Sequence, residues 1–234
     1  MFRVEDLVLE PPGITCVLGP NGAGKSTFLK TLAGAHRPLE GTVRLEPEGV
    51  GRAYAPPFPP VGVGLDGWGL LHVITESRAP LVGGVMPPRV RRALSLLGEL
   101  GEPRGGLSSP LSAMSTGEAM KVMLAGVLAS GAEALFLDEP NGHLDAASRA
   151  RLYGILEREA GGRLVVVSLH DALEAAQVCS RAVVIGRGGD VVWGEAGEVL
   201  VPRVLERAYG VSFASVRLGG RSLPLPLLGG EGLD

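Results

Sequence analysis

The sequence contains few aromatic residues and no excess of positive charge. Phe, Trp and Tyr make up 4% of its 234 residues, so aliphatic side chains must fill the hydrophobic core. Lys and Arg number 22 against 25 Asp and Glu, which gives a formal net charge of −3. A dedicated nucleic-acid-binding protein needs a basic face, and the only dense basic run, RVRR at 89–92, fits the solvated side of a helix. We therefore expect no nucleic-acid partner.

Cysteines and long hydrophobic runs are also scarce. Cys16 lies in an apolar run and Cys179 in a helical pattern, so we expect two buried free thiols, as in a reducing compartment. The longest near-apolar stretch, residues 122–132, is far shorter than the roughly 20 residues that a transmembrane helix needs. The first residues lack the pattern of a signal peptide. The sequence predicts a soluble protein, which does not exclude attachment to a membrane partner.

Short apolar runs alternate with helical patterns along most of the chain. The runs at 134–138, 163–168 and 181–186 are nearly continuous, as is typical of buried parallel strands. Residues 14–18 form a further strand of this kind, and helices are expected between the strands, at 25–34, 117–130, 146–160 and 171–180. This order predicts an α/β fold with a mainly parallel sheet.

Two segments in the first half of the chain depart from this alternation. Residues 42–46 and 50–54 resemble a short antiparallel pair of strands. From about residue 60 to residue 115 the sequence is rich in Pro and Gly and then shows one helical pattern near 88–100. We interpret this stretch as an inserted, mostly helical subdomain.

The tail, from about residue 201 to residue 234, is a third departure. It begins with a short helical pattern, VPRVLERAYG at 201–210, and continues with a short β-like piece. Its last six residues, GGEGLD, are expected to fray. No internal repeat is visible, so we expect a single domain over residues 1–234.

A glycine-rich loop carries the most specific motif. Residues 19–27, GPNGAGKST, fit the pattern G-x-x-x-x-G-K-[ST] and lie between a strand and a helix, as this motif requires. Lys25 would neutralise the β- and γ-phosphates of a nucleotide, and the Ser26 hydroxyl would bind Mg²⁺. The alternative is a glycine-rich turn with an unrelated lysine. The loop residues expected to contact the nucleotide are Pro20, Asn21, Gly22, Ala23, Gly24, Lys25, Ser26 and Thr27.

Two further motifs follow apolar strands. ALFLDEP ends in Asp138, which can hold Mg²⁺ directly or through water, and Glu139, which could polarise the water that attacks the γ-phosphate. In LVVVSLHD, His170 could reach the γ-phosphate as a hydrogen-bond donor. Alone, an acidic pair in a turn and a single histidine after a strand are more often structural. Their place after the phosphate-loop motif favours the catalytic interpretation.

The segment MSTGE at 114–118 precedes an apolar helix and allows two interpretations. Ser115 and Glu118 fit the S-x-x-E capping box, in which each side chain satisfies a backbone N–H of the first turn. The N-terminus of a helix is also a favourable place for a phosphate. From these residues alone, both interpretations stay open.

The order of these motifs, together with NGHLD at 141–145, resembles the ATP-binding subunits of ATP-binding cassette (ABC) transporters over nearly the whole chain. MSTGE stands at the position of the family's signature sequence, usually LSGGQ. Ser115, Gly117 and Glu118 match its serine, second glycine and final polar residue, whereas the first and third residues of the segment differ.

This resemblance implies a fold, an activity and partners. The fold would be that of P-loop ABC ATPases, with a mainly parallel sheet, a small antiparallel β part and an inserted helical subdomain. The chain would hydrolyse ATP with Mg²⁺. Two copies would pack head to tail as a homodimer, with Asp145 at the dimer contact and the signature helix of each copy facing the γ-phosphate bound by the other. The pair would lie on the cytoplasmic side of the cell membrane, peripherally attached to permease subunits.

Two segments resemble a narrower group, the subunits that serve importers of iron–siderophore complexes, haem and cobalamin. They are residues 73–84 and the tail from 191 to 216. This likeness implies an extracytoplasmic substrate-binding protein as a further partner. The ATP-binding subunit rarely contacts the cargo, so two alternatives stay open. One is an ABC transporter of another substrate class, including an exporter. The other is a non-transport ABC ATPase, such as an iron–sulfur assembly subunit.

Two departures from the family pattern lead to predictions. Pro57 stands where the family usually has a glutamine that reaches Mg²⁺ and the attacking water, and the chain's only glutamine is Gln177. Proline has neither a side-chain amide nor a backbone N–H, so we expect slower hydrolysis or altered coupling. The family's N-terminal strand, whose aromatic residue stacks on adenine, looks shortened or absent. Phe2 is the candidate ring, and we expect weak discrimination between ATP and GTP.

Overall fold

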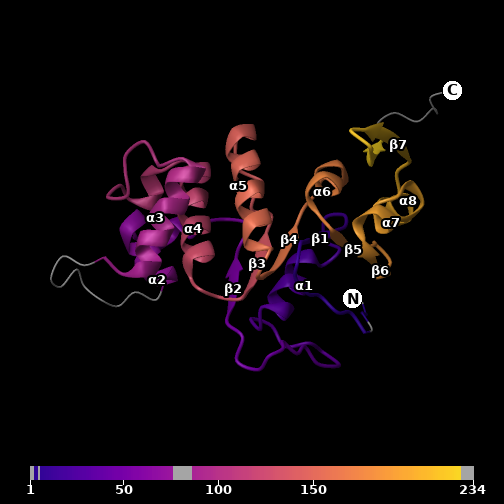
Figure 1. Cartoon of the computed structure of the whole chain (residues 1–234), viewed down its shortest axis with the longest axis horizontal. Coiled ribbons are helices and arrows are strands. Elements are labelled where there is room, and N and C mark those ends of the chain that lie inside the picture. Colours follow the sequence, from indigo (N-terminus) through magenta and orange to yellow (C-terminus); the bar gives the residue numbers. More distant parts are fainter. Residues whose placement is uncertain (1–2, 5, 76–85, 228–234) are drawn as a thin grey trace.

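A central six-stranded sheet organises the chain in a computed structural model, which describes residues 3–4, 6–75 and 86–227 (Figure 1). The strand order is β2-β3-β4-β1-β5-β6. The first five strands are parallel, and β6 runs antiparallel to β5. Their bounds are β1 Ile14–Leu18, β2 Arg52–Ala55, β3 Ala134–Asp138, β4 Leu164–Ser168, β5 Arg181–Ile185 and β6 Val191–Glu195. The predicted α/β fold with a mainly parallel sheet is confirmed.

The central strands are apolar on both faces because helices cover both faces of the sheet. In β3, Leu135 and Leu137 belong to the larger core cluster, whereas Phe136 belongs to a second, smaller cluster. This alternation follows from the two-residue period of a strand. Helix α1 (Lys25–Leu32) packs on the smaller cluster, and helices α4 (Thr116–Ala129), α5 (Ala146–Glu159) and α6 (Ala172–Val178) pack on the larger one. The nearly continuous apolar runs of the sequence reflect this double cover.

The segment between β2 and β3 is mostly helical. Its described residues contain α2 (Gly67–Ile74), α3 (Pro88–Leu100) and α4, with short 3₁₀ turns at Val61–Val63 and Leu111–Ala113. Helices α2 and α3 pack against α4 beside the β2 edge of the sheet (Figure 1). Helix α3 has the bounds that the sequence predicts, with Pro88 in its first turn and Gly101 at its C-cap. Most of the importer-like segment 73–84 lies outside the described residues.

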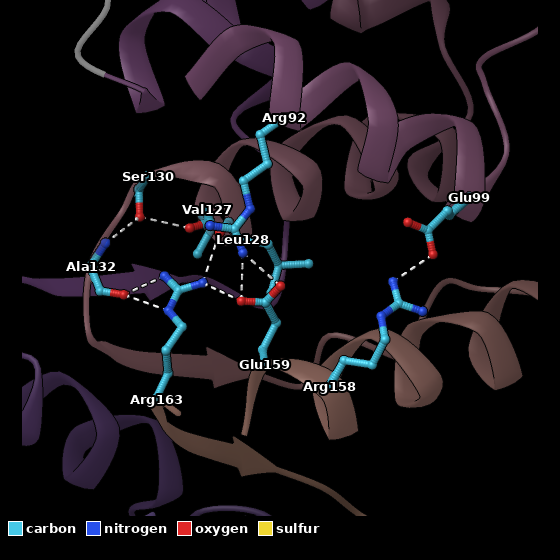
Figure 2. A network of polar contacts seen from close by, with 9 residues as sticks. All are labelled: Arg92, Glu99, Val127, Leu128, Ser130, Ala132, Arg158, Glu159 and Arg163. Atoms are coloured by element: carbon cyan, nitrogen blue, oxygen red, sulfur yellow. Dashed lines mark hydrogen bonds and ion pairs between the residues drawn. The ribbon is translucent and has the colours of Figure 1, made fainter. Parts of the chain in front are cut away.

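A polar network joins the end of α5 to α3 (Figure 2). Arg92 donates from one nitrogen to both carboxylate oxygens of Glu159, at 2.7 Å each, and Arg158 pairs with Glu99 at 2.6 Å. Arg163 contacts Glu159 from the other side at 2.6 Å. Burial alone would raise the pKa of Glu159. The hydrogen bonds from Arg163 and Arg92 outweigh this effect, so that the pKa is lower than usual. The carboxylate of Glu159 therefore connects Arg92 of the helical segment with Arg163, which directly precedes β4.

Arg163 also closes the end of α4. Its guanidinium donates to the carbonyl oxygen of Leu128, in the last turn of that helix, and to that of Ala132, just after it (Figure 2). A cation at a helix C-terminus satisfies carbonyls that lack an intrahelical partner and complements the helix dipole. The same side chain thus fixes both the C-terminal end of α4 and the position of Glu159.

The tail lies at the opposite end of the sheet, beyond β6 (Figure 1). It follows the short helix α7 (Ala196–Val199) and contains α8 (Pro202–Tyr209) and a separate antiparallel hairpin of β7 (Phe213–Leu218) and β8 (Arg221–Pro226). The predicted helix at 201–210 and the β-like piece after it are confirmed. The final residues that we expected to fray lie outside the described part of the chain. Among the described residues, none of the helices has the length and apolar content needed to cross a membrane.

The expected antiparallel pair of residues 42–46 and 50–54 is wrong. Residues 42–46 form no strand, and β2 pairs in parallel with β3, so that Tyr54 lies opposite Phe136. Gly41 and Gly49 adopt positive φ angles on either side of residues 42–46, which breaks the extended run. Pairing with the buried strand β3 brings β2 into the main sheet. The antiparallel β parts are β5 with β6 and β7 with β8.

The expectation of two free thiols is also wrong. Cys16 in β1 and Cys179 after α6 form a disulfide across 163 residues of sequence. The chain leaves α6 directly beside β1, because Ser180 donates its backbone N–H to Ile14 and the next residues pair with β1 as β5. The two Cα atoms therefore lie 5.9 Å apart, within the range that a disulfide spans. The inference of a reducing compartment rests on two free thiols, and the disulfide removes the support for that inference.

Candidate functional site

The phosphate-loop segment turns from β1 into α1 exactly where the sequence predicts it. Gly19, Gly22 and Gly24 have positive φ angles, which glycine adopts without strain. A Cβ atom on Gly19 would lie 2.3 Å from the carbonyl oxygen of Ile185, so only glycine fits there. Gly24 precedes α1, and within the described residues no side chain caps the first turn of this helix. The uncapped N–H groups and the helix dipole suit an anion.

Lys25 is held inside this loop. Its side chain is buried, and its Nζ donates to the carbonyl oxygens of Gly19 at 2.9 Å and Pro20 at 3.4 Å. Burial lowers the pKa of Lys25, and the nearby carboxylates of Glu139 and Asp138 partly oppose this. The ammonium group is thus in place to exchange loop carbonyls for phosphate oxygens.

Asp138 ends β3 as a completely buried carboxylate with a donor at each oxygen. Ser168, at the end of the neighbouring strand β4, donates to Oδ1 at 2.5 Å, and Tyr54, in β2, donates to Oδ2 at 3.0 Å. Burial and the charge of Asp138 raise the pKa of the Tyr54 hydroxyl, so it stays protonated as a donor. These two bonds fix the carboxylate at the edge of the sheet that the phosphate loop also occupies.

Glu139 and His170 lie together beside Asp138. Glu139 has a φ angle of 50°, which is uncommon for a residue other than glycine and points to a functional constraint on the backbone. Its backbone N–H donates to Ser168 Oγ at 2.9 Å. His170 Nε2 lies 2.7 Å from Glu139 Oε1, and half of the His170 side chain is exposed. A carboxylate held by an imidazole at an accessible edge can orient and polarise a water molecule.

The segment 115–118 forms the capping box that the sequence predicts. Ser115 Oγ accepts from the N–H of Glu118 at 3.3 Å, and the Glu118 carboxylate accepts from the N–H of Ser115 at 2.9 Å. Glu118 also accepts from the N–H of Arg104, and these hydrogen bonds lower its pKa to about 2. A Cβ atom on Gly117 would lie 2.6 Å from the carbonyl oxygen of His143, so glycine is required here. Ser115 is exposed.

Asp145 also caps a helix. It accepts from the N–H of Ser148 at 2.8 Å and from the Ser148 hydroxyl at 2.9 Å, at the start of α5. These hydrogen bonds lower the pKa of Asp145. Its side chain is 65% exposed, and Lys121 Nζ lies 3.9 Å away. The local role of Asp145 is structural, and its exposed face leaves a further contact open.

The predicted residues form two groups within one chain. Lys25, Asp138, Glu139 and His170 come together where β1, β3 and β4 end, next to the loop of residues 19–27. The segment 115–118 belongs to a separate group. Across the described residues, its hydrogen bonds connect to its own helix and to Arg104 and do not reach the phosphate loop. The hydrogen bonds of residues 115–118 thus leave this segment unconnected to the phosphate loop in the described part of the same chain.

The sequence did not reveal three polar contacts of the site. Ser168 could have been found, because it ends the strand beside β3 and lies in register with Asp138. Tyr54 depends on the parallel pairing of β2, which we had expected to be antiparallel. The Tyr209 hydroxyl accepts a hydrogen bond from the N–H of Gly19 at 3.0 Å. The two residues are 190 positions apart, so no local sequence pattern predicts this contact. Burial raises the pKa of Tyr209 to about 12, so the hydroxyl stays neutral.

The loop after β2 has no polar side chain at the expected glutamine position. Pro57 lies in the run APPFPP, whose Phe58 ring is tilted against the ring of His143 with centroids 5.1 Å apart. Pro56 and Pro60 line a groove of about 620 Å³ between β2 and helices α2 and α4. Phe2, the candidate adenine-stacking ring, lies outside the described residues.

The side chains present suit Mg²⁺ and a nucleoside triphosphate. Mg²⁺ prefers hard oxygen ligands, keeps several waters and needs only one or two protein groups when phosphates supply the rest. The buried Asp138 carboxylate and the Ser26 hydroxyl offer such oxygens beside the phosphate loop. In the described residues there is no cluster of three or more His, Cys, Asp or Glu side chains that would hold a metal ion by itself. A site completed by phosphate oxygens agrees with both observations.

Sequence comparisons agree with this geometry. The sequence profile of the family described as "ABC transporter" matches residues 5–142. The iron(3+)-hydroxamate import ATP-binding protein of Bacillus subtilis (strain 168) is 30% identical over 224 residues, which cover 89% of this chain and 82% of that protein. A hemin import ATP-binding protein of Streptomyces coelicolor is 32% identical over 212 residues, which cover 87% of this chain and 76% of that protein.

Solved structures share the fold. The ATP-binding subunit of an ABC transporter superposes with a TM-score of 0.70 at 25% identity, covering 88% of this chain and 87% of that one. The dimeric ATP-binding cassette MJ0796, bound to ADP and Pi, superposes with a TM-score of 0.67 at 20% identity. The superposition covers 83% of this chain and 90% of that one. At that identity the second likeness concerns the fold alone. The expected mainly parallel sheet with helices and a small antiparallel part agrees with both.

Proposed function

The chain belongs to the ABC transporter family, and from this premise we propose that it is the ATP-hydrolysing subunit that powers import of an iron chelate, haem or cobalamin. The observation that carries the proposal is the meeting of Lys25, Asp138, Glu139 and His170 beside an uncapped helix N-terminus. Relatives named as import proteins for iron(3+)-hydroxamate and hemin support this cargo class. They favour an importer over an exporter and over an assembly ATPase.

Catalysis in this proposal rests on positioning and on neutralising charge. The N–H groups of residues 22–27 and the Lys25 ammonium bind the phosphates, and Ser26 and Asp138 hold Mg²⁺. Mg²⁺ held by Ser26 and Asp138 would supply positive charge to neutralise the phosphates. Glu139 orients the attacking water and draws its proton, while His170 holds the Glu139 carboxylate in place and can donate to the γ-phosphate.

The active unit would be a homodimer. Ser115, Gly117 and Glu118 lie at the capped N-terminus of α4, where Ser115 is exposed, and among the described residues their hydrogen bonds do not extend to the phosphate loop of their own chain. In a head-to-tail pair, the remaining N–H groups of this helix would face the γ-phosphate that the other copy binds. Asp145, with its exposed carboxylate, would lie at the contact between the copies. ATP binding would close the pair and hydrolysis would reopen it.

The ATP-binding dimer would bind permease subunits in the membrane to form the transporter. The groove between β2 and the helical segment has walls formed by Pro56, Pro60 and Leu70, together with the exposed side chain of Val73. A groove that combines these apolar walls with charged lining residues, here Arg89 and Glu133, suits a short helix of a permease loop. The chain would sit peripherally on the cytoplasmic side of the membrane, and a substrate-binding protein would deliver the cargo outside.

Two measurements test this proposal. Phosphate release from MgATP should fall at least about 100-fold in Lys25→Ala and in Glu139→Gln, because one removes phosphate binding and the other the group acting on water. Co-purification from membranes should recover a permease. Recovery of soluble iron–sulfur assembly proteins instead would favour the alternative, and no phosphate release from the wild type would contradict the ATPase assignment.

A further inference from the structure

The loop that follows β2 reaches from the catalytic edge to the groove, yet it cannot make a side-chain hydrogen bond. Residues 56–60 read PPFPP, so four of the five side chains are pyrrolidine rings and the fifth is Phe58. The resemblance to ABC subunits predicts a glutamine in this loop as the link between Mg²⁺ and the membrane partner. That link must be absent in this chain or be made by another residue.

Tyr54 is in position to make the link. Its hydroxyl donates to Asp138 Oδ2 at 3.0 Å, and the residue lies in β2 only two positions before the first proline. The backbone between them is part of the sheet, because Ala55 pairs with Leu137. Tyr54 also borders the groove that Pro56 and Pro60 line. A change in the orientation of the Asp138 carboxylate therefore acts on Tyr54 and, through it, on the start of the loop.

The far side of the loop has a second contact. Phe58, with 63% of its side chain exposed, packs its ring against His143. His143 lies two residues before Asp145, the expected dimer contact, and its carbonyl oxygen is in close contact with Gly117 in the signature helix. Proline fixes φ near −65°, so a loop built largely of prolines transmits a displacement better than a flexible one.

We propose that Tyr54 is a positioning residue that takes over the role of the missing glutamine. It orients Asp138 for Mg²⁺, and it couples that carboxylate through the rigid 56–60 loop and the Phe58–His143 contact to residues 141–145. The inference rests on the proposed ATPase function, because Mg²⁺ and nucleotide are the ligands that move Asp138. It adds a route that does not require a side-chain amide.

The test compares ADP binding with and without metal in the full-length chain. Loss of a hydrogen bond to a charged carboxylate should weaken MgADP binding by Tyr54→Phe about tenfold, while ADP binding in EDTA stays within about twofold of the wild type. Calorimetry gives both affinities. Hydrogen exchange should show that MgADP alters residues 141–145 in the wild type and leaves them unaltered in Tyr54→Phe. A merely structural tyrosine would lower affinity equally with and without the metal.

Two matched variants sharpen the result. Ser215→Ala removes a hydroxyl that contacts Ser222 in the β7–β8 hairpin, outside the catalytic edge, and should leave both the binding and the exchange response at wild-type values. Phe58→Ala truncates an exposed ring, so it should fold even if Tyr54→Phe does not. It should keep the MgADP affinity and lose the exchange response of residues 141–145.

Equal MgADP affinity and an unchanged exchange response in Tyr54→Phe would overturn the inference and leave the ATPase proposal intact. A full exchange response in Phe58→Ala would overturn the coupling route. Failure of the wild type to bind ADP under any condition would contradict the proposed function itself.

Discussion

Asp138 keeps both of its carboxylate oxygens engaged although its side chain is entirely buried. Ser168 is central to this arrangement, because its Oγ donates to Asp138 and accepts from the N–H of Glu139. One hydroxyl thus holds the Asp138 carboxylate, the proposed metal ligand, and the strained backbone of Glu139, the residue that we propose acts on water. Because Asp138 is buried, the loss of either hydrogen-bond partner would be costly.

Ser168→Ala should therefore affect both stability and catalysis. It leaves Asp138 Oδ1 and the Glu139 N–H without this partner, so we expect a loss of about 2–4 kcal/mol in the free energy of unfolding. Urea unfolding measures this, and the phosphate release rate should fall as well. Ser130→Ala, which removes a hydroxyl that contacts only helix-end backbone groups, should cost about 1 kcal/mol or less and spare catalysis. Equal losses in the two variants would contradict the role assigned to Ser168.

At the scale of elements, the Glu159 carboxylate connects α5 with α3 and with the end of α4 (Figure 2). Its side chain is 11% exposed, whereas the neighbouring pair of Arg158 and Glu99 is 59% and 43% exposed. Solvent weakens the second pair, so the orientation of the helical segment depends mainly on the first.

The stability that Glu159 provides should depend on pH in a defined direction. Its pKa is lower in the folded chain than the usual value of 4.5. Its contribution is therefore fully present above pH 4.5 and is lost as the pH falls through the lower folded-state pKa. Glu159→Gln should cost about 2 kcal/mol at pH 7, and the difference from the wild type should shrink in the acid range. Glu99→Gln should cost less than about 0.5 kcal/mol. Urea unfolding of the wild type and the variants at pH 7 and below pH 4.5 measures these differences in the free energy of unfolding. A loss in Glu159→Gln that is the same at both pH values would contradict the prediction.

Elements with a complete local signal could be predicted from the sequence. Strands 14–18 and 134–138 have their observed bounds because they are continuous apolar runs with turn residues beyond them, and α3 is bounded by Pro88 and Gly101. Strand β6 went unpredicted, although the Gly188–Gly189 turn before it signals a hairpin. Residues 42–46 alternate like a strand but have no partner in the sheet. The pairing of β2 with β3, the disulfide and the Tyr209 contact join residues more than 75 positions apart, which no local pattern encodes.

At the scale of the whole molecule, the two groups of residues that we propose form the reaction site are not joined by hydrogen bonds within the described part of one chain. The phosphate loop, Asp138, Glu139 and His170 lie at one edge, while the capped helix of Ser115 and Glu118 contacts its own neighbours. A second copy can bring the two groups together, and the nucleotide would then lie between the copies. In the proposed dimer, MSTGE of one copy binds the phosphate that the other copy holds.

Light scattering of Glu139→Gln with and without MgATP tests this claim most directly. This variant should keep the phosphate contacts while hydrolysis is slowed, so we predict that its mass doubles only when MgATP is present. Adding Ser115→Arg should abolish the doubling, because a large side chain would then occupy the phosphate position at the helix N-terminus. A Glu139→Gln chain that stays monomeric at saturating MgATP, or a doubling that survives Ser115→Arg, would contradict the account.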